Sequence, residues 1–338
     1  MSPQMKSRER VMASLRHTQP DKVPYHLDFT VPARAAMAAW YGDPDFEASL
    51  GNCLAVVDTE PQGSWRRLDG DVWADQFGVQ WDRTIDKDIG TVCNVALTPD
   101  NLRTYEFPDP EDPAGFEGWK EAIAGRGDAF VVANLGFSLF ERAWTLAGME
   151  TVLMAMADDK GFVNALLDRI LDFNLKVIEK ACSYPIDAMR FGDDWGHQRG
   201  LIMGRALWKE LIGPRVKRMY GLARSRGKRV FIHSCGKVDE LFPDLIEAGV
   251  DVFNPFQPEV MDVYEMKRRY GGRLSFFGGI STQKTLPYGS ERAVRDEVKR
   301  LLDDVGRNGG YIASPAHAIP KDAKPENVAA MIEVLRGQ

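Results

Sequence analysis

The sequence predicts an α/β protein: a single (β/α)8 barrel over residues 1–338, with helical and β-ribbon additions near the N-terminus. From Ala129 onward, short apolar segments typical of strands alternate six times with longer segments of helical periodicity. This order and spacing suit parallel strands joined by crossover helices. Polar residues follow many strand ends, as at the active-site face of a barrel, whereas an open sheet would gather them at one switch point.

The N-terminal part is expected to supply two strands and the additions to the barrel. Strands are predicted at residues 23–29, ending near His26 and Asp28, and between Cys53 and Val57, which brings the total to eight. Helical periodicity predicts helices over residues 7–17 and 32–40. Alternating apolar residues between Asp71 and Asp86 predict an antiparallel ribbon that residues 91–97 extend.

The remaining elements are the six β-α units. Strands are expected at residues 129–134, 186–191, 229–232, 250–254, 274–279 and 311–314. Helices are expected from 140 to 167, from there to about 184, and over 206–226, 238–248, 263–270, 291–305 and 325–336. The last helix has Pro325 near its start and Gly337 after its end, as helices commonly do.

From its composition, the chain is expected by default to be a cytoplasmic enzyme. Apolar residues make up 44% of the chain, enough for a substantial core, and the net charge is −6. Lys and Arg are dispersed, which argues against nucleic-acid binding. The sequence has no apolar run of about 20 residues that could span a bilayer and no apolar signal core. Four scattered cysteines do not form a disulfide framework.

The strongest candidate site combines three potential metal ligands. His233 and Cys235, two residues apart at a strand end, point to the same side. His317 follows the last predicted strand. Imidazole and thiolate ligands suit Zn²⁺, and three protein ligands leave a fourth position for a reactant. The alternative is a buried histidine beside a small apolar cysteine, with His317 hydrogen-bonded inside its proline-flanked turn.

Polar residues at other strand ends are candidates for catalysis and substrate binding. Asp193 or Asp194 is expected to bind substrate or donate a proton, unless the pair caps a helix or pairs with Arg190. The expected substrate-binding residues are Gln198, Asn254, Gln257, Asp28 and Glu141. Carboxylates at helix starts are also common for dipole reasons alone, which is the alternative for Glu141.

Several segments together carry a family resemblance. They are residues 8–17, 20–24, 193–196, 232–236, 277–280 and 325–331. In this ordered set the chain resembles the uroporphyrinogen decarboxylase superfamily over essentially its whole length. The resemblance implies one (β/α)8 barrel domain.

The His-x-Cys element is similar to that of a zinc-dependent methyltransferase branch, which moves a methyl group between a corrinoid protein and a thiol such as coenzyme M. The resemblance implies zinc at His233 and Cys235 with His317 as third ligand, where that branch has a cysteine. A site with two histidines is less electron-rich, so a bound thiolate would be less nucleophilic. True porphyrinogen decarboxylases need no metal and carry an Arg-rich motif that residues 28–34 lack.

We therefore expect a zinc-dependent methyltransferase of an O-demethylase-type system. Its partners would be a small-molecule methyl donor or acceptor and a separate protein that carries the corrinoid, with no nucleic acid and no membrane. One alternative is a metal-independent decarboxylase of a porphyrinogen-like or smaller aromatic acid. Another is a non-catalytic barrel that binds a small ligand.

Overall fold

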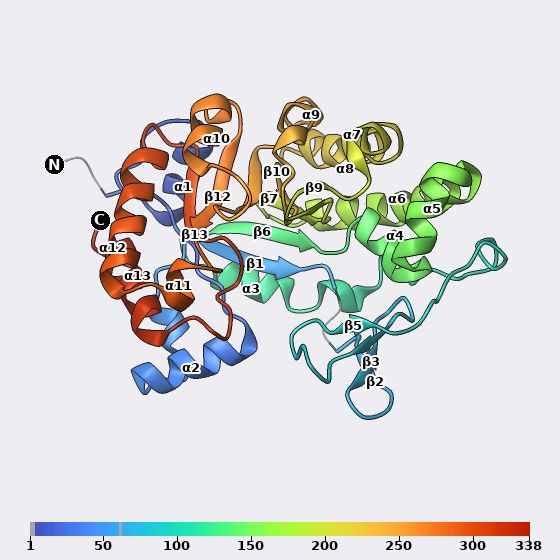
Figure 1. Ribbon diagram of the computed structural model, residues 1–338, viewed down its shortest axis with the longest axis horizontal. Helices are drawn as coiled ribbons and strands as arrows, with labels where there is room; N and C mark the ends of the chain where they lie inside the picture. The colour runs from blue at the N-terminus through green and yellow to red at the C-terminus, as the bar shows by residue number, and fades with distance from the viewer. Residues whose placement is uncertain (1–3, 61–62) are drawn as a thin grey trace.

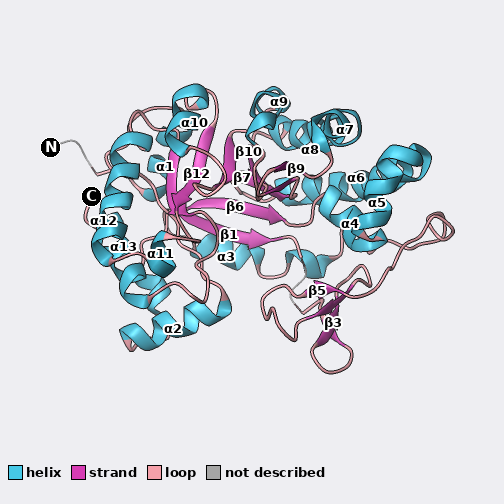
Figure 2. Cartoon of the chain, viewed as in Figure 1, coloured by secondary structure: helices cyan, strands magenta, loops and turns pink. Residues whose placement is uncertain are grey.

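The computed structural model describes residues 4–60 and 63–338 and contains a curled parallel sheet of seven strands with helices packed around it (Figures 1 and 2). In spatial order the strands are β1 (Leu54–Asp58), β6 (Phe130–Leu135), β7 (Ala188–Gly192), β10 (Arg229–His233), β11 (Val252–Phe256), β12 (Ser275–Ile280) and β13 (Tyr311–Pro315). Each strand is parallel to its neighbour. The predicted α/β barrel-type fold is confirmed.

The eighth position of the barrel differs from the prediction of a regular strand at residues 23–29. The segment makes only isolated parallel bridges, Tyr25 to Ala313 and Phe29 to Ile319. On its other side, the Cys53 N–H donates to the Tyr25 carbonyl, so the segment lies between β13 and the start of β1. Between the two bridges the Leu27 N–H donates to Asn52 Oδ1 at 2.8 Å and the Leu27 carbonyl accepts from Asn52 Nδ2 at 3.0 Å, so these backbone groups do not join a continuous ladder.

The helices lie around the sheet. They are α1 (Ser7–Leu15), α2 (Val31–Tyr41), α3 (Trp119–Gly125), α4 (Phe140–Ala147), α5 (Met149–Asp158), α6 (Lys160–Cys182), α7 (Gly204–Leu207), α8 (Gly213–Ser225), α9 (Phe242–Ala248), α10 (Val263–Tyr270), α11 (Thr285–Tyr288), α12 (Glu291–Arg300) and α13 (Pro325–Arg336). π-helical turns over 208–212 and 301–305 continue the predicted helices there. Among the described residues, none of the helices combines the length and apolar character needed to cross a membrane.

The predicted helix boundary near residue 167 is wrong. The stretch from 140 is broken earlier, at Gly148, whose φ of 86° is left-handed. It is broken again at Asp159, whose side chain accepts from the Phe162 N–H and caps α6. From that cap, α6 continues without interruption through Leu167 to Cys182.

The predicted ribbon is confirmed as a four-stranded antiparallel sheet. It consists of β2 (Arg66–Arg67), β3 (Val72–Ala74), β4 (Gln80–Asp82) and β5 (Thr91–Val92). Figure 1 shows it on the side of the molecule toward which the arrowheads of β1 and β6 point. The ribbon therefore lies toward the carboxyl ends of the barrel strands.

The barrel interior is layered. Its apolar layer consists of Leu54, Phe130, Val132, Ala188, Phe231, Val252, Phe277 and Ile312, closed by Val11 and Leu15 of α1. Two residues further along five of the strands, on the same side of the sheet, stand Asn134, Arg190, His233, Asn254 and Ser314, and Asp58 follows four residues after Leu54 on β1. The inward face thus changes from apolar to polar toward the carboxyl ends of the strands.

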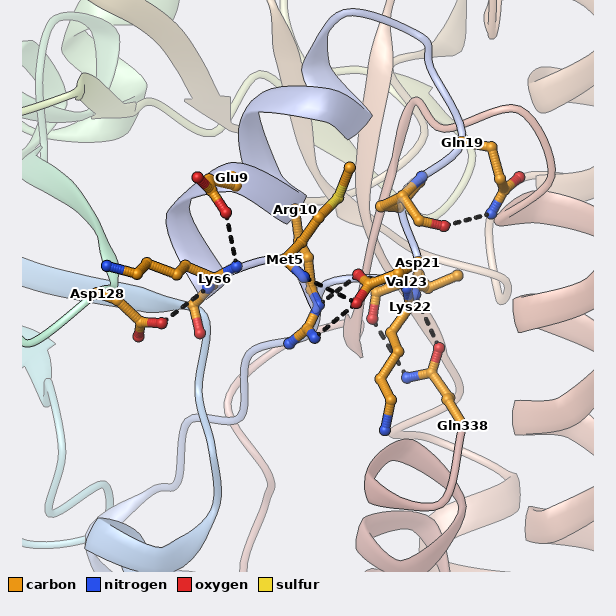
Figure 3. A network of polar contacts seen from close by, with 12 residues as sticks. Met5, Lys6, Glu9, Arg10, Gln19, Asp21, Lys22, Val23, Asp128 and Gln338 are labelled. Carbon is orange, nitrogen blue, oxygen red and sulfur yellow. Dashed lines mark hydrogen bonds and ion pairs between the residues drawn. The ribbon is translucent and has the colours of Figure 1, made fainter. Parts of the chain in front are cut away.

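A polar network links helix α1 to the loop that follows it (Figure 3). Arg10 donates from Nε and Nη2 to the two oxygens of Asp21, at 2.7 and 2.9 Å. The Met5 N–H also donates to Asp21, at 3.1 Å. Next to this pair, the Val23 N–H donates to Gln338 at 2.9 Å and ties the C-terminal residue to the same region. The hydrogen bonds from Arg10 are the main cause that lowers the pKa of Asp21 to about 2.

We expect Asp21→Asn to lower the free energy of unfolding at pH 7 by about 1 kcal/mol, because both groups are partly exposed and solvent screening reduces the full value of the pKa shift. Since the pKa of Asp21 is lowered on folding, its contribution is present above the unfolded-state pKa. It disappears as the pH falls from about 4 toward 2. Urea unfolding of both proteins across this range measures the effect. Asp296→Asn, in an exposed ion pair with Arg292, is the matched control with little expected change.

Candidate functional site

A cavity of about 600 Å³ opens at the carboxyl ends of the strands. It is lined from below by the polar layer of the barrel and from the sides by the loops that follow the strands. The polar and charged lining residues are His26, Asp28, Glu47, Asn52, Asp58, Asn134, Glu141, Arg190, Asp194, His233, Asn254, Ser314 and His317. Phe137 and Phe277 contribute aromatic surface.

Three side chains with metal-ligating atoms come together at this cavity. The ligating atoms of His233, Cys235 and His317 all lie within 4.8 Å of one another. Cys235 Sγ is 3.4 Å from His233 Nε2, and the two imidazole rings are 5.5 Å apart at their centroids. The structure thus brings together the three residues that the sequence analysis selected, and their ligation of a metal stays a prediction.

The loop after β10 explains how Cys235 reaches this position. Gly236 has a φ of 85°, and a Cβ there would lie 2.5 Å from the carbonyl carbon of Gly196. Only glycine permits both the left-handed conformation and this close approach. The chain turns sharply after Cys235 and directs its thiol back toward His233.

Asn254 fixes the orientation and tautomer of His233. The Asn254 Nδ2 donates to the Phe277 carbonyl at 3.0 Å, so its Oδ1 faces His233 Nδ1 at 2.6 Å and accepts a hydrogen bond from it. The Nε2 lone pair then points toward Cys235. Burial lowers the pKa of His233 to about 4, which keeps the imidazole neutral. A neutral imidazole oriented by a hydrogen bond at its other nitrogen is the form that binds metal ions.

The two adjacent aspartates have different environments. Asp194 lines the cavity, and its Oδ1 accepts from the Cys235 N–H at 2.7 Å. Asp193 is fully buried and does not line it; it accepts from the Glu141 N–H at 2.8 Å and the Trp195 indole at 2.6 Å. Asp193 therefore caps the start of α4, as the alternative interpretation of the pair stated. Of the two candidates, only Asp194 can reach a molecule in the cavity.

The predicted substrate-binding residues fall into two groups. Asp28, Glu141 and Asn254 line the main cavity. Burial, with the nearby carboxylates of Asp194 and Asp193, raises the pKa of Glu141 well above its ordinary value. Gln198 and Gln257 line a separate hollow of about 380 Å³ that Cys235 and His317 also border.

The sequence analysis gave no site role to several lining residues, among them Asp58, Asn134 and Arg190. Asn134 donates to Asp58 at 2.6 Å and accepts from Arg190 Nε at 2.8 Å, which links the carboxyl ends of β1, β6 and β7. One signal could have found Arg190, because a charged residue inside the apolar run 186–191 is unusual for a buried strand.

The family model described as uroporphyrinogen decarboxylase (URO-D) matches residues 74–338. The chain belongs to the uroporphyrinogen decarboxylase family. The family resemblance read from the sequence is therefore confirmed. Curated relatives named uroporphyrinogen decarboxylase include one from Pseudomonas fluorescens, 25% identical over 71% of this chain and 69% of its own length. Another from Methylococcus capsulatus is 24% identical over 70% of this chain and 68% of its own length.

A solved structure shares the fold along the whole chain. It is a methyltransferase from Methanosarcina mazei, matched with a TM-score of 0.72 and 17% sequence identity over 98% of this chain and 99% of that one. At this identity the likeness establishes the architecture, and it agrees with the barrel that the sequence predicted.

Proposed function

We propose that this family member is a zinc-dependent methyltransferase that moves a methyl group between a methylated donor or corrinoid protein and an acceptor. The observation that carries the proposal is the group of one thiol and two imidazoles within 4.8 Å at the edge of the barrel cavity. The methyltransferase with the same fold supports it.

The donor set fits zinc. Two imidazole nitrogens and one thiolate are ligands that Zn²⁺ binds well, and three protein ligands are the number found in catalytic zinc sites. His233 is already held as the neutral tautomer in which Nε2 carries no proton, and Cys235 Sγ lies 3.4 Å from that nitrogen. Burial raises the pKa of the Cys235 thiol, so the thiol keeps its proton without the metal, and we expect metal binding to displace that proton.

When bound, the zinc would act as a Lewis acid toward an acceptor thiol or a leaving oxygen. The other tasks belong to the side chains of this protein. Asn254 orients His233, and Asp194 holds the loop of Cys235 through its backbone N–H. Asp194 and Glu141 also face the cavity, where either carboxyl group is placed to hold or release a proton. We further propose that the corrinoid is carried by a separate protein that docks over the cavity mouth.

The decisive experiment combines metal analysis with a methyl-transfer assay. We expect the purified protein, loaded with zinc and desalted, to retain about one zinc per chain. Methyl transfer between methylated donors and a free corrinoid, followed by the corrinoid absorption spectrum, is expected to stop on chelation and return with zinc. Retention of no zinc would contradict the proposal, and retained zinc without turnover would favour a binding barrel.

Decarboxylation is the second candidate. It is favoured by the curated relatives, which are named uroporphyrinogen decarboxylase. On this hypothesis the cavity accepts a porphyrinogen-like or smaller aromatic acid and the reaction needs no metal. Release of CO₂ that is unaffected by chelation, from a protein that retains no zinc, would establish this alternative in place of methyl transfer.

Asn254→Leu is expected to weaken zinc affinity about 10- to 100-fold, the usual effect of removing a group that orients a metal-binding histidine. The leucine cannot accept from His233 Nδ1, so the ring loses its fixed tautomer. Competition with a chromogenic chelator measures the affinity. Asn254→Asp, which keeps an acceptor at this position, is the matched variant and should lose much less. Equal affinities of the leucine variant and the wild type would show that Asn254 does not support the site.

A further inference from the structure

Arg190 lies at the floor of the cavity. In the parallel register of the sheet it stands beside Asn134 of β6 and Phe231 of β10, whereas His233 stands beside Gly192. Arg190 is therefore one strand away from His233 and one layer deeper in the barrel. By ordinary sheet spacing this separates their backbones by about 4.8 Å sideways and about 6.6 Å along the strand.

The guanidinium of Arg190 is incompletely paired. Its Nε donates to Asn134 Oδ1 at 2.8 Å. Within residues 4–60 and 63–338, no carboxylate lies within 4.0 Å of it, and its terminal NH₂ groups have no protein acceptor; Arg190 also lines the cavity. The two fully buried arginines among the described residues do have carboxylate partners: Arg142 pairs with Asp75 at 2.9 Å and Arg215 with Asp168 at 2.7 Å.

We propose that Arg190 binds an anionic oxygen group, a carboxylate or a sulfonate, on the small molecule that occupies this cavity. The inference rests on the proposed function, since it names the substrate class of the same site. An arginine keeps its charge at neutral pH, and a half-buried charge without a close partner is stabilised when an opposite charge reaches it. The planar fork of a guanidinium also matches the two oxygens of a carboxylate.

The charges of Asp58 and Asp28 act on Arg190, but among the described residues no carboxylate around the cavity forms an ion pair with it. Asp58 is directed to the amide of Asn134, at 2.6 Å. Asp194 accepts from the Cys235 N–H. Asp28 has a side chain that is 64% exposed at the rim, near Arg34. An anion that enters the cavity can therefore reach the terminal groups of Arg190 at its floor. This position lies one layer deeper in the barrel than His233, one of the three candidate metal ligands.

The first test uses metal-free protein and two aromatic probes of equal size, benzoate and neutral benzamide, in calorimetric titrations. We expect the wild type to bind benzoate about 10- to 100-fold more tightly than benzamide, the usual range for a charge-assisted pair. Arg190→Gln should abolish this preference, and Arg190→Lys should retain part of it. Arg34→Gln removes a charge at the rim, where Arg34 pairs with Glu47, and should leave the preference intact. Benzenesulfonate shows which kind of anion the site favours.

No detectable binding of benzoate, equal binding of the two probes, or an unchanged preference in Arg190→Gln would overturn the inference. Unfolding temperatures of all variants verify folding, and if Arg190→Gln does not fold, the lysine variant and the wild-type preference decide.

A second titration, of zinc-loaded protein with 3-mercaptopropionate and 2-mercaptoethanol, separates this inference from the proposed function. If both thiols require zinc but bind equally, the role of Arg190 is refuted and the metal site stands. If zinc has no effect while benzoate still depends on Arg190, the zinc proposal fails and the anion site stands.

Discussion

Replacing Asp75 with alanine is expected to lower the free energy of unfolding by about 3–5 kcal/mol, because it leaves a buried charge without its partner. The side chains of Asp75 and Arg142 are 2% and 7% exposed, and they are 2.9 Å apart. Asp75 also accepts from the Phe77 and Val79 N–H groups and from the Trp81 indole. One carboxylate thus joins the β-ribbon to the start of α4.

Chemical denaturation of the wild type and Asp75→Ala measures this effect, and the double variant Asp75→Leu/Arg142→Met is its control. Replacing both partners by apolar side chains removes the unpaired charge, so we expect the double variant to be more stable than the single one. A loss below about 1 kcal/mol in Asp75→Ala would show that water reaches Arg142 and that the pair does not hold the ribbon.

This ion pair also lies next to the candidate site. The guanidinium of Arg142 is 4.0 Å from the ring centroid of Phe77 and 5.5 Å from that of Phe137, which lines the cavity. Phe137 in turn packs against Trp81 of the ribbon, with ring centroids 5.3 Å apart. Part of the cavity wall is therefore supported by the ribbon and not by the barrel alone.

The sequence predicts elements well where a local signal fixes both ends. The bounds expected for α10 and α13 agree with the structure, because Asp262 and Pro325 mark their starts and Gly271 and Gly337 follow their ends. The alternation of strands and helices also predicted the parallel sheet. Tertiary packing decides the remaining cases. Residues 23–29 look like a strand, yet the Asn52 side chain bonds to both backbone groups of Leu27, and only isolated bridges form.

Side-chain direction is the part of the site that the sequence does not contain. Asp193 and Asp194 cannot be distinguished in the sequence. In the turn after β7, the Asp193 side chain points toward the backbone of α4 and the Asp194 side chain points to the cavity. Gln198 and Gln257 follow strand ends as expected, yet they line a second hollow that Cys235 borders and not the main cavity. Arg190 belongs to the site because adjacent strands place it beside Asn134, a relation that only the sheet register reveals.

Cys235→Ala is expected to weaken zinc binding about a hundred- to a thousandfold, since it removes one of three ligands whose combined contribution is on the order of 10 kcal/mol. Chelator competition on the desalted protein measures the affinity. Cys93→Ala is the matched control, because Cys93 is an exposed free cysteine on the ribbon side of the molecule and should not contribute. Equal zinc affinity of the two variants would mean that Cys235 is not a ligand of the zinc.

His317→Ala tests the third ligand, the one that reaches the site from a different strand end. His317 is exposed, whereas His233 and Cys235 are half-buried, so alanine at 317 should disturb folding least and report most directly on ligation. We expect a loss of zinc affinity comparable to that of Cys235→Ala, with an unchanged unfolding temperature of the metal-free protein. If His317→Ala binds zinc as tightly as the wild type, the ion is held by the His-x-Cys pair alone. The barrel's last strand would then contribute to the cavity wall but not to the metal.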